Sequence, residues 1–263
     1  MSVYADLFRY RELFGNLFRR DLQAKYRGSA LGVLWTIVNP IMLMGVYLLV
    51  FSVLWNTRFA SVAHYPLFLL SGLAIWTFFA AALQSSTRSM LDNANLIRKT
   101  RFPRQLVPLS VVGAHLVSFA AMLVLLLLLN GILLPRVRAT ELLAIPLAVL
   151  VVGLVSGLAL ALASLNVLFR DVEFIVAAAL VPWFFLTPVI YPLSQFASHH
   201  KVVDVIHWVN PLSPAVQAVR APLFLGQLPF WGDALYLVLA CAAALALGAW
   251  VFSRVDDQIA IEV

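Results

Sequence analysis

Charged residues are scarce in this sequence: they make up 11% of its 263 residues, while 63% are hydrophobic. A soluble domain has roughly a quarter of its residues charged and about half apolar. Too little polar surface is therefore available here to cover a water-soluble globule, in keeping with the mean hydropathy of +0.95. The composition excludes a disordered chain, an ordinary cytosolic enzyme and, with Cys241 as the single cysteine, a disulfide scaffold. It indicates an integral membrane protein.

Several kinds of binding and catalytic chemistry are also missing. A phosphate-binding loop ends in Gly-Lys-Ser/Thr, but the only lysines are Lys25, Lys99 and Lys201, and none follows a glycine. The chain therefore lacks the motif for ATP hydrolysis by that class of site. No acidic residue lies between Asp21 and Asp92, which disfavours proton coupling through a carboxylate in mid-membrane.

The histidines do not suggest a catalytic or metal site. His115 lies deep in an apolar stretch, where a lone histidine more often hydrogen-bonds between helices than relays protons. His199, His200 and His207 have only Asp204 nearby in the sequence, and metal ligation usually needs convergent acids or thiols as well. We predict no metal site and no catalytic constellation, and interpret these three histidines as part of a hydrated outer loop.

The gaps between charged residues predict the membrane topology. A helix needs about 20 mainly apolar residues to cross the hydrocarbon core. Six stretches without Asp, Glu, Lys or Arg reach that length: 28–57, 59–87, 105–135, 142–169, 174–200 and 234–253. We expect an all-α integral membrane fold with six transmembrane helices. The expected organisation is a cytoplasmic interface helix 1–27, a six-span domain 28–254 and a cytoplasmic tail 255–263.

A proline-rich stretch precedes the last predicted span. Residues 205–219 and 221–232 are uncharged, but they are too short to cross a bilayer and contain four prolines. Short helices that dip part-way into the membrane fit this pattern better, provided that protein or a water-filled cavity covers their backbone. We expect residues 191–232 to form a re-entrant cap on one face.

Lysine and arginine are distributed unequally over the two faces that six spans create. With both termini on one side, 13 of the 18 Lys and Arg residues lie on that side. Such charges mark cytoplasmic loops, so both termini and the loop 88–104 are predicted to be cytoplasmic and the 191–232 cap to lie outside. This distribution explains the net charge of +6 without nucleic acid as a partner.

The segment before the first span has the pattern of an amphipathic helix. At 100° per residue, the apolar residues at positions 3, 7, 10, 14 and 17 share one face, and three arginines lie nearly opposite. Asp21 and Lys25 have the i,i+4 spacing of a favourable ion pair. We expect this helix in the cytoplasmic interface, either as a simple anchor or facing lipid phosphates or a protein partner.

Aromatic residues are frequent in the predicted spans. Trp35, Trp183, Phe184 and Phe185 are candidates for lining a substrate path, because aromatic faces stack on the apolar surfaces of sugar rings. For each of them taken singly, an interface-belt or packing role is the simpler interpretation.

Two glycine pairs have the spacing of small-residue helix faces. Gly28 with Gly32 opens the first predicted span, and Gly153 with Gly157 lies in the fourth. Such faces allow two helices to approach closely. The pattern predicts packing and says little about function.

Four longer strings carry a family resemblance. They are LFRRDLQAKYRGSALGVLWTIVNP at 17–40, NLIRKTRFPRQLVP at 95–108, LNVLFRDVEF with FFLTPVIYP within 165–192, and NPLSPAVQAVRAPLFLG at 210–226. In this order they resemble ABC-2 type permeases that export polysaccharides, and together they cover most of the chain. The subgroup that they resemble most is the transport subunit of exporters for O-antigen, teichoic acid and related cell-wall glycans.

The resemblance implies a homodimer of six-helix subunits with two copies of a separate ATP-binding subunit on the cytoplasmic face. That partner would bind ATP and magnesium, so this chain would need no cofactor of its own. The 191–232 segment would be the outer gate, and Arg170 with Asp171 would form a structural ion pair at the cytoplasmic end of the fourth span.

The resemblance also implies a surface that couples this chain to the ATPase, built from the N-terminal helix and the loop 88–104. Carried over to this sequence, the coupling surface comprises Arg19, Arg20, Asp21, Lys25, Arg27, Asn95, Arg98, Lys99, Arg101, Pro103 and Arg104. Pro103 would break the loop helix and set its angle to the third span. Arginines that bind phosphate and arginines that dock an ATPase look alike in sequence, and their division stays open.

The resulting expectation is a transport subunit, itself not an enzyme, in the bacterial inner membrane. It would move a polyprenyl-pyrophosphate-linked polysaccharide from the cytoplasmic to the outer face, driven by ATP hydrolysis in its partner. The alternatives are an ABC-2 permease for drugs or small lipids, a membrane enzyme of undecaprenyl-lipid metabolism, and a passive channel. O-antigen, teichoic acid, capsule and mycobacterial-type galactan all remain open as the glycan.

Overall fold

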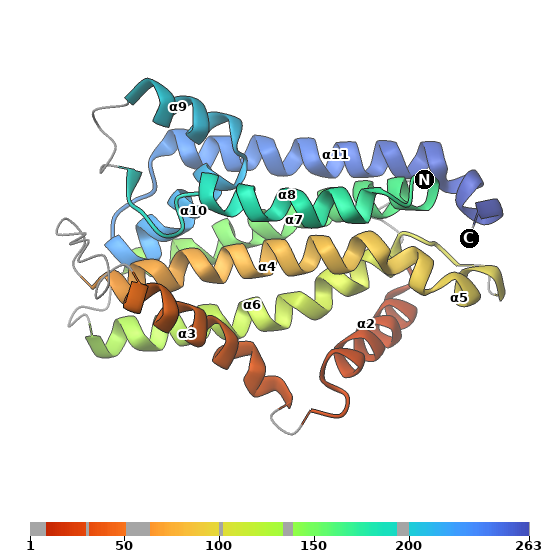
Figure 1. The fold of residues 1–263 in the computed structure, drawn as a ribbon, viewed down its shortest axis with the longest axis horizontal. Coiled ribbons are helices and arrows are strands. Elements are labelled where there is room, and N and C mark those ends of the chain that lie inside the picture. Colours follow the sequence, from red (N-terminus) through yellow and green to blue (C-terminus); the bar gives the residue numbers. More distant parts are fainter. Residues whose placement is uncertain are drawn as a thin grey trace.

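The computed structural model describes residues 9–29, 32–50, 64–99, 102–133, 139–193 and 200–262. Within these ranges every regular element is helical, and the long helices run side by side in one bundle (Figure 1). The first half of the chain forms α2 (Arg11–Tyr26), η1 (Gly32–Leu34), α3 (Trp35–Leu48), α4 (Tyr65–Asp92), α5 (Ala94–Lys99) and α6 (Leu106–Leu133). The second half forms η3 (Ala139–Leu143), α7 (Ala144–Leu168), α8 (Val172–Leu186), α9 (His200–Val209), α10 (Leu212–Arg220), η5 (Ala221–Leu225) and α11 (Trp231–Glu262).

Four of the described helices are long and apolar enough to cross a membrane. They span Tyr65–Asp92, Leu106–Leu133, Ala139–Leu168 and Trp231–Asp256. These ranges correspond to the second, third, fourth and sixth predicted spans.

The first and fifth predicted spans contain shorter helices. Among the described residues, helix α3 has 14 residues and α8 has 15, which at 1.5 Å per residue gives about 21 to 23 Å of helix, and the end of the first predicted span, from residue 51, lies outside the described residues. In place of one helix over 174–200, α8 ends at Leu186, and residues 187–191 form turns and bends. The proline inside α8, Pro182, lies near this end.

Helix α4 is the centre of the bundle. Within its most apolar 18-residue window 78% of the residues are buried, against 22% for α6, so α6 presents far more apolar surface outward. The buried apolar residues of α4 pack with residues of α6, α7, α8, α10 and α11. The start of α4 is defined locally, because Pro66 occupies its first turn, where the missing backbone N–H needs no partner.

Helices α7 and α11 approach each other closely. A Cβ on Gly157 would collide with the backbone of Ala244, and a Cβ on Gly248 would collide with the carbonyl of Gly157. Gly153 faces the Cys241 sulfur in the same interface. The predicted packing role of Gly153 and Gly157 is thus confirmed.

The other glycine pair has a different role. Gly28 and Gly32 have φ angles of +78° and +48° and nothing within 4 Å of a Cβ built on them. They turn the chain between α2 and α3, so the expectation of a helix-packing face there was wrong. The physical reason is that Gly28 lies in the turn after α2 while Gly32 begins η1, so the two residues do not share one helix face.

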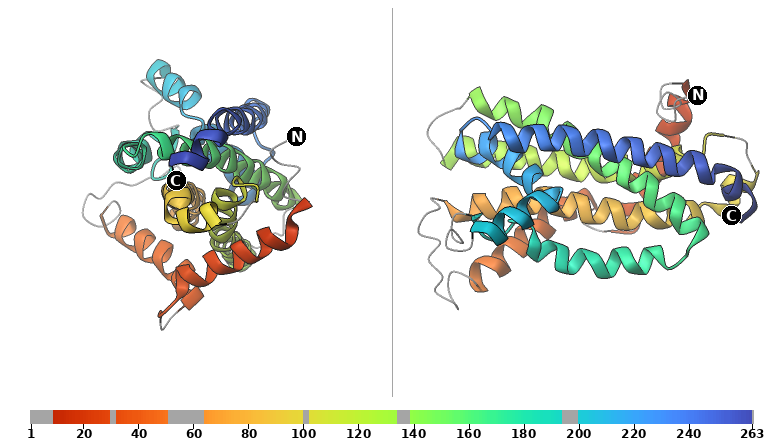
Figure 2. Two further views of the ribbon diagram at one scale, coloured as in Figure 1. Left: turned by 90° about the vertical axis from the view of Figure 1, so that its right-hand side faces the viewer. Right: turned by 90° about the horizontal axis from the view of Figure 1, so that it is seen from above.

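The two ends of the bundle are distinct. Helix α5 and the C-terminal part of α11 lie at one end, which we name the α5 end, and α9 and α10 lie at the other, the α9 end (Figures 1 and 2). Helix α2 does not run along the bundle but crosses its outside against α6 (Figure 2). Its contact face agrees with the predicted amphipathic pattern: Leu17 is buried, and Phe14 and Phe18 pack at Gly113 of α6.

Candidate functional site

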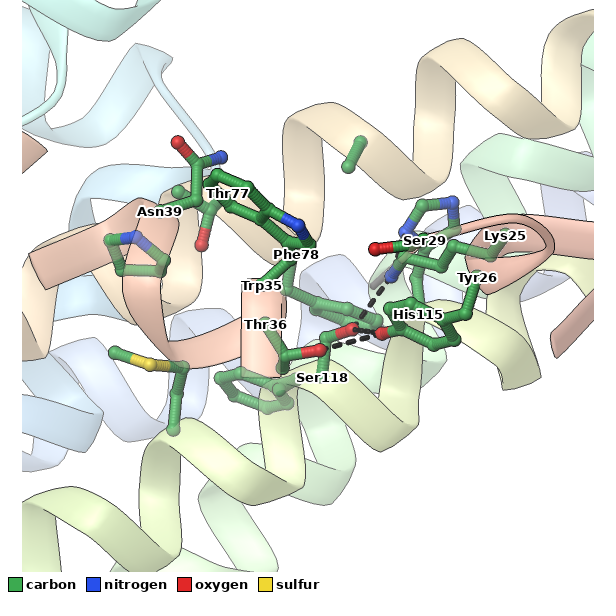
Figure 3. A pocket seen from close by; sticks show the side chains of 14 residues that line it. Lys25, Tyr26, Ser29, Trp35, Thr36, Asn39, Thr77, Phe78, His115 and Ser118 are labelled. Atoms are coloured by element: carbon green, nitrogen blue, oxygen red, sulfur yellow. Dashed lines mark hydrogen bonds between the residues drawn. The ribbon is translucent and has the colours of Figure 1, made fainter. Parts of the chain in front are cut away.

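A cavity of about 370 Å³ lies where α2 turns into α3 and meets α4 and α6. Figure 3 shows that polar side chains from α2 and α6 gather on one side of it. Lys25 and Tyr26 come from the end of α2, and His115 and Ser118 come from α6. Trp35, which is 46% exposed, lies on its rim at the start of α3.

The polar side chains in this cavity are joined by short hydrogen bonds. The Lys25 amine donates to the Ser118 hydroxyl at 2.6 Å and lies 3.3 Å from Nδ1 of His115. The Tyr26 hydroxyl is 2.6 Å from that of Thr36 and 3.1 Å from that of Ser118. These bonds connect α2, α3 and α6. The partial burial of the Lys25 amine lowers its pKa from the ordinary value.

His115 also joins two of the long helices. Its Nε2 lies 3.1 Å from the Ser85 hydroxyl of α4. This contact confirms the expectation that the lone histidine of the third apolar stretch hydrogen-bonds between helices. Its other ring nitrogen faces the cavity.

Asp21 and Lys25 do not pair with each other, although their spacing suggested an ion pair. The Asp21 carboxylate accepts hydrogen bonds from Ser110 of α6 at 2.6 Å and from its neighbour Arg20 at 2.7 Å. Lys25 is bonded to Ser118 of α6 instead. Both side chains thus fasten α2 to α6, and the local i,i+4 expectation was wrong because α6 offers better-placed partners. Arg19, Arg20 and Arg27 remain exposed along α2.

The residues of the predicted coupling loop differ in their exposure. Asn95, Arg98 and Lys99 are exposed on α5, whereas Arg104 donates to the Asp256 carboxylate of α11 at 2.9 Å. Pro103 lies in the connection between α5 and α6, where its carbonyl accepts from the Leu106 N–H at the start of α6. Arg101 lies outside the described residues.

A second hollow, of about 440 Å³, opens at the α5 end. Arg88, Arg98 and Arg170 line it together with Glu173 and Phe174. The expected ion pair between Arg170 and Asp171 is not formed, since both side chains are exposed and neither has an ion-pair partner among the described residues. Arg88 forms ion pairs instead, with the carboxylate of Glu173 at 3.4 Å and with that of Asp92 at 3.6 Å. The pair between Arg88 and Glu173 joins α4 to α8.

The four aromatic residues proposed for a substrate path do not line one common space. Trp183 donates through Nε1 to Asn210 at 2.7 Å, and Phe184 is buried against Trp76. Phe185 is 59% exposed on the surface of α8. Trp35 is separate from these three, at the rim of the cavity beside Lys25.

Sequence reasoning missed a buried arginine at the α9 end. Arg220 is 1% exposed and donates to the Ser71 hydroxyl at 3.2 Å, the Pro188 carbonyl at 2.8 Å and the Val189 carbonyl at 3.3 Å. In the predicted topology Arg220 is one of the five Lys and Arg residues on the outer side. The sequence does contain a signal for this burial, because Arg220 is a single charged residue within an apolar segment. Ionisable residues at membrane depth are usually enclosed by protein.

The outer histidines also differ from the prediction of a hydrated loop. His207 is buried, with Nδ1 2.8 Å from the Ser213 hydroxyl and Nε2 2.8 Å from the Asp233 carboxylate. This order of serine, histidine and acid is that of a hydrolase triad. Ser213 is 0% exposed, however, so no substrate reaches it, and the chain of bonds serves to connect α9, α10 and α11.

Comparison with known proteins decides the family. The model of a family described as ABC-2 type transporter matches residues 12–224. The chain belongs to the ABC-2 type transporter family. This match includes α2, both hollows and the α9–α10 segment, so the features described above lie within the family's domain.

Several curated proteins are similar to this chain. It is 34% identical over 259 residues to the O-antigen export system permease protein RfbA of Myxococcus xanthus, an alignment that covers 98% of this chain and 96% of that protein. A Klebsiella pneumoniae protein of the same name is 29% identical over 218 residues, which is 80% of each chain. The polysialic acid transport protein KpsM of Escherichia coli is 22% identical over 248 residues, covering 92% of this chain and 93% of that one.

Proposed function

We propose that this chain is the permease subunit of an ATP-driven exporter that moves a polyprenyl-pyrophosphate-linked polysaccharide outward across a bacterial inner membrane. The observation that carries the proposal is the 34% identity to an O-antigen export permease over nearly the full length of both proteins. A second relative named for polysialic acid transport favours a glycan over a drug or small lipid as cargo.

The energy source in this proposal is a separate ATP-binding subunit. The sequence has no Gly-Lys-Ser/Thr loop, while the family to which it belongs is a transporter family. In the proposed assembly two permease chains associate with two copies of the ATP-binding subunit. Helices α3 and α8 would then complete six membrane segments per chain, and the exposed apolar residues of α8, such as Phe174 and Val181, would face lipid or the second permease.

The α5 end would be cytoplasmic, because most of the Lys and Arg residues lie on that side of the predicted topology. The proposed coupling surface consists of exposed polar and charged residues of the α2 and α5 segments together with one residue of the following loop. The exposed residues are Arg19, Arg20, Arg27, Asn95, Arg98 and Lys99, and the loop residue is Arg101, which lies outside the described residues. Asp21, Lys25 and Arg104 would act through the contacts that hold α2, α6 and α11 together.

The test is co-purification with the ATP-binding subunit from the native host, combined with an assay of surface glycan. The double variant Arg98→Glu with Arg101→Glu should lose the ATPase partner and export by about tenfold or more while still inserting into the membrane, because it reverses two charges of the docking surface. The matched control is Lys201→Glu, which reverses one exposed charge at the α9 end and should retain both.

Two results would count against the proposal in different ways. A wild-type chain that purifies in an active form without any ATP-binding subunit would overturn the exporter assignment. Normal export by the Arg98→Glu and Arg101→Glu double variant would leave the exporter intact and refute only the coupling surface.

A further inference from the structure

The cavity at the α2–α3 junction combines two kinds of surface. The amine and hydroxyls of Lys25, Tyr26 and Ser118 gather on one side (Figure 3). The remaining lining includes the apolar side chains of Trp35 and Phe119, together with the polar side chains of Asn39 and Thr77. A cavity that offers a cationic polar cluster and apolar surface together fits an amphiphile better than a simple ion.

Lys25 gives the polar side an uncompensated positive charge. Among the described residues no carboxylate lies within ion-pair distance of its amine, and its neighbours there are Ser118 and His115. The acid one turn earlier, Asp21, is already bound by Arg20 and Ser110. An ammonium has three donors, and Lys25 uses one on Ser118 and a second on Nδ1 of His115, which leaves the third for a ligand. A cation in such surroundings is stabilised by an anion that accepts from the remaining donor.

The cavity lies part-way along α6, beside α2. His115 and Ser118 lie 9 and 12 residues into α6, which at 1.5 Å per residue places them about 14 and 18 Å from the helix start. Helix α2 crosses the bundle at this level with its arginines exposed. A lipid phosphate at Lys25 could therefore extend its chain along the outward apolar surface of α6.

We propose that this cavity binds the phosphate head of a polyprenyl-linked lipid, with Lys25, Tyr26 and Ser118 holding the phosphate oxygens. This inference rests on the proposed function and assigns the head group of its cargo to a site. It also divides the cationic residues: Lys25 binds the lipid head, and the exposed arginines of α2 and α5 are left for the partner subunit.

The test measures binding to the purified full-length chain in detergent, with farnesyl pyrophosphate as the probe. Farnesol has the same tail without phosphate, and inorganic pyrophosphate has the head without the tail. We expect farnesyl pyrophosphate to bind at least about tenfold more tightly than either, because only it can use the charged and the apolar sides together.

Substitutions locate the site. Lys25→Gln should weaken farnesyl pyrophosphate binding by about tenfold or more, since it removes the charged donor. Lys25→Arg keeps the charge and should retain part of the affinity, and Ser118→Ala tests the same site without altering charge. Lys201→Gln, which removes an exposed lysine at the α9 end, should bind like the wild type. Size-exclusion profiles and melting temperatures of all variants separate lost binding from lost folding.

Each remaining outcome overturns the inference. Equal binding by Lys25→Gln and wild type would place the phosphate elsewhere. Equal binding of farnesol would show an apolar pocket only, and equal binding of inorganic pyrophosphate would show a free-anion site. Equal competition by phosphatidylglycerol in mixed micelles would show a general phospholipid site. None of these outcomes touches ATP-dependent glycan export with the partner subunit, so the proposed function is tested separately.

Discussion

The guanidinium carbon of Arg220 lies 3.8 Å from the centre of the Phe68 ring. This cation–π contact joins the end of α10 to the start of α4, and the same guanidinium donates to the carbonyls of Pro188 and Val189 in the turn after α8. No carboxylate takes part in it among the described residues. One side chain therefore fastens three segments at the α9 end, and a movement of α10 during transport would have to carry α4 and this turn along or break these bonds.

Gly72 supplies the space for this arginine. A Cβ built on Gly72 would collide with a terminal nitrogen of Arg220 and press on the backbone of Val189. We predict that Gly72→Ala lowers the stability by about 2–4 kcal/mol, which a thermal melt in detergent would detect as a lower Tm. Gly45→Ala is the control, because that helical position has nothing within 4 Å and should not lower the Tm.

The same contact predicts strong coupling between the two positions. Arg220→Ala should itself cost about 2–5 kcal/mol, through the lost charge-assisted hydrogen bonds and the space left behind. Once the arginine is absent, Gly72→Ala should cost much less, so the double variant should be clearly more stable than the sum of the single losses. If the two losses of stability are additive, glycine is required at position 72 because of the Val189 backbone and not because of Arg220.

The α7–α11 interface gives a second prediction about glycine. Gly157→Ala should destabilise the chain by about 1–3 kcal/mol, because its methyl group has to displace the backbone of Ala244. Gly131→Ala in α6 meets open space and should be neutral or raise the stability by up to about 1 kcal/mol, since alanine favours the helix. Melting temperatures of both variants provide the comparison, and a loss of equal size at Gly131 would contradict a specific packing role for Gly157.

Trp183 allows the packing and substrate-path interpretations to be separated. Its Nε1 donates to Asn210, which also accepts from the backbone N–H of Leu212 and donates to Thr187. We predict that Trp183→Phe costs about 1 kcal/mol of stability and lowers assembly and export in proportion, because it deletes one internal hydrogen bond. Phe185→Ala, at an exposed position, should leave the Tm nearly unchanged. A loss of export in Trp183→Phe with unchanged Tm and assembly would favour the substrate path.

What the sequence predicted well depended on patterns within one segment. The apolar stretch 59–87 contains most of α4, the stretch 105–135 contains all of α6, and the spacing of Gly153 and Gly157 does produce a packing face. Length, hydropathy and the small size of glycine act locally, so a single sequence reveals them.

The remaining features depend on residues far apart in the chain. Arg220 donates to Ser71, which is 149 positions away, and Lys25 donates to Ser118, which is 93 positions away. No periodicity encodes such partners. The spacing of Asp21 and Lys25 predicted that they pair with each other, but in the folded chain each is bonded to a serine hydroxyl of α6. These hydroxyls lie beside α2 only because α2 packs across α6. The charges were thus correctly noticed, but their roles required the packed structure.

The lowered pKa of Lys25 leads to the last prediction, a pH dependence of lipid binding. Burial disfavours the charged amine, so in the free protein it loses its proton at a lower pH than the ordinary value of 10.5. Above about pH 8 a phosphate group is fully ionised, and an ordinary histidine is neutral. Only the protonated amine attracts the anion. Farnesyl pyrophosphate binding should therefore weaken as the pH rises through the pKa of Lys25, over a window that begins below 10.5.

Lys25→Arg is the decisive comparison for this pH profile, because a guanidinium stays charged throughout the window. Its dissociation constant for farnesyl pyrophosphate should stay nearly constant from about pH 8 to about pH 10, while that of the wild type rises. Tyr26 also lines the cavity beside Lys25, and the ionisation of such neighbouring groups is linked, so both profiles are measured in a Tyr26→Phe background, in which only the residue at position 25 differs. If the two profiles fall together, the titrating group is not Lys25, and its amine does not hold the phosphate.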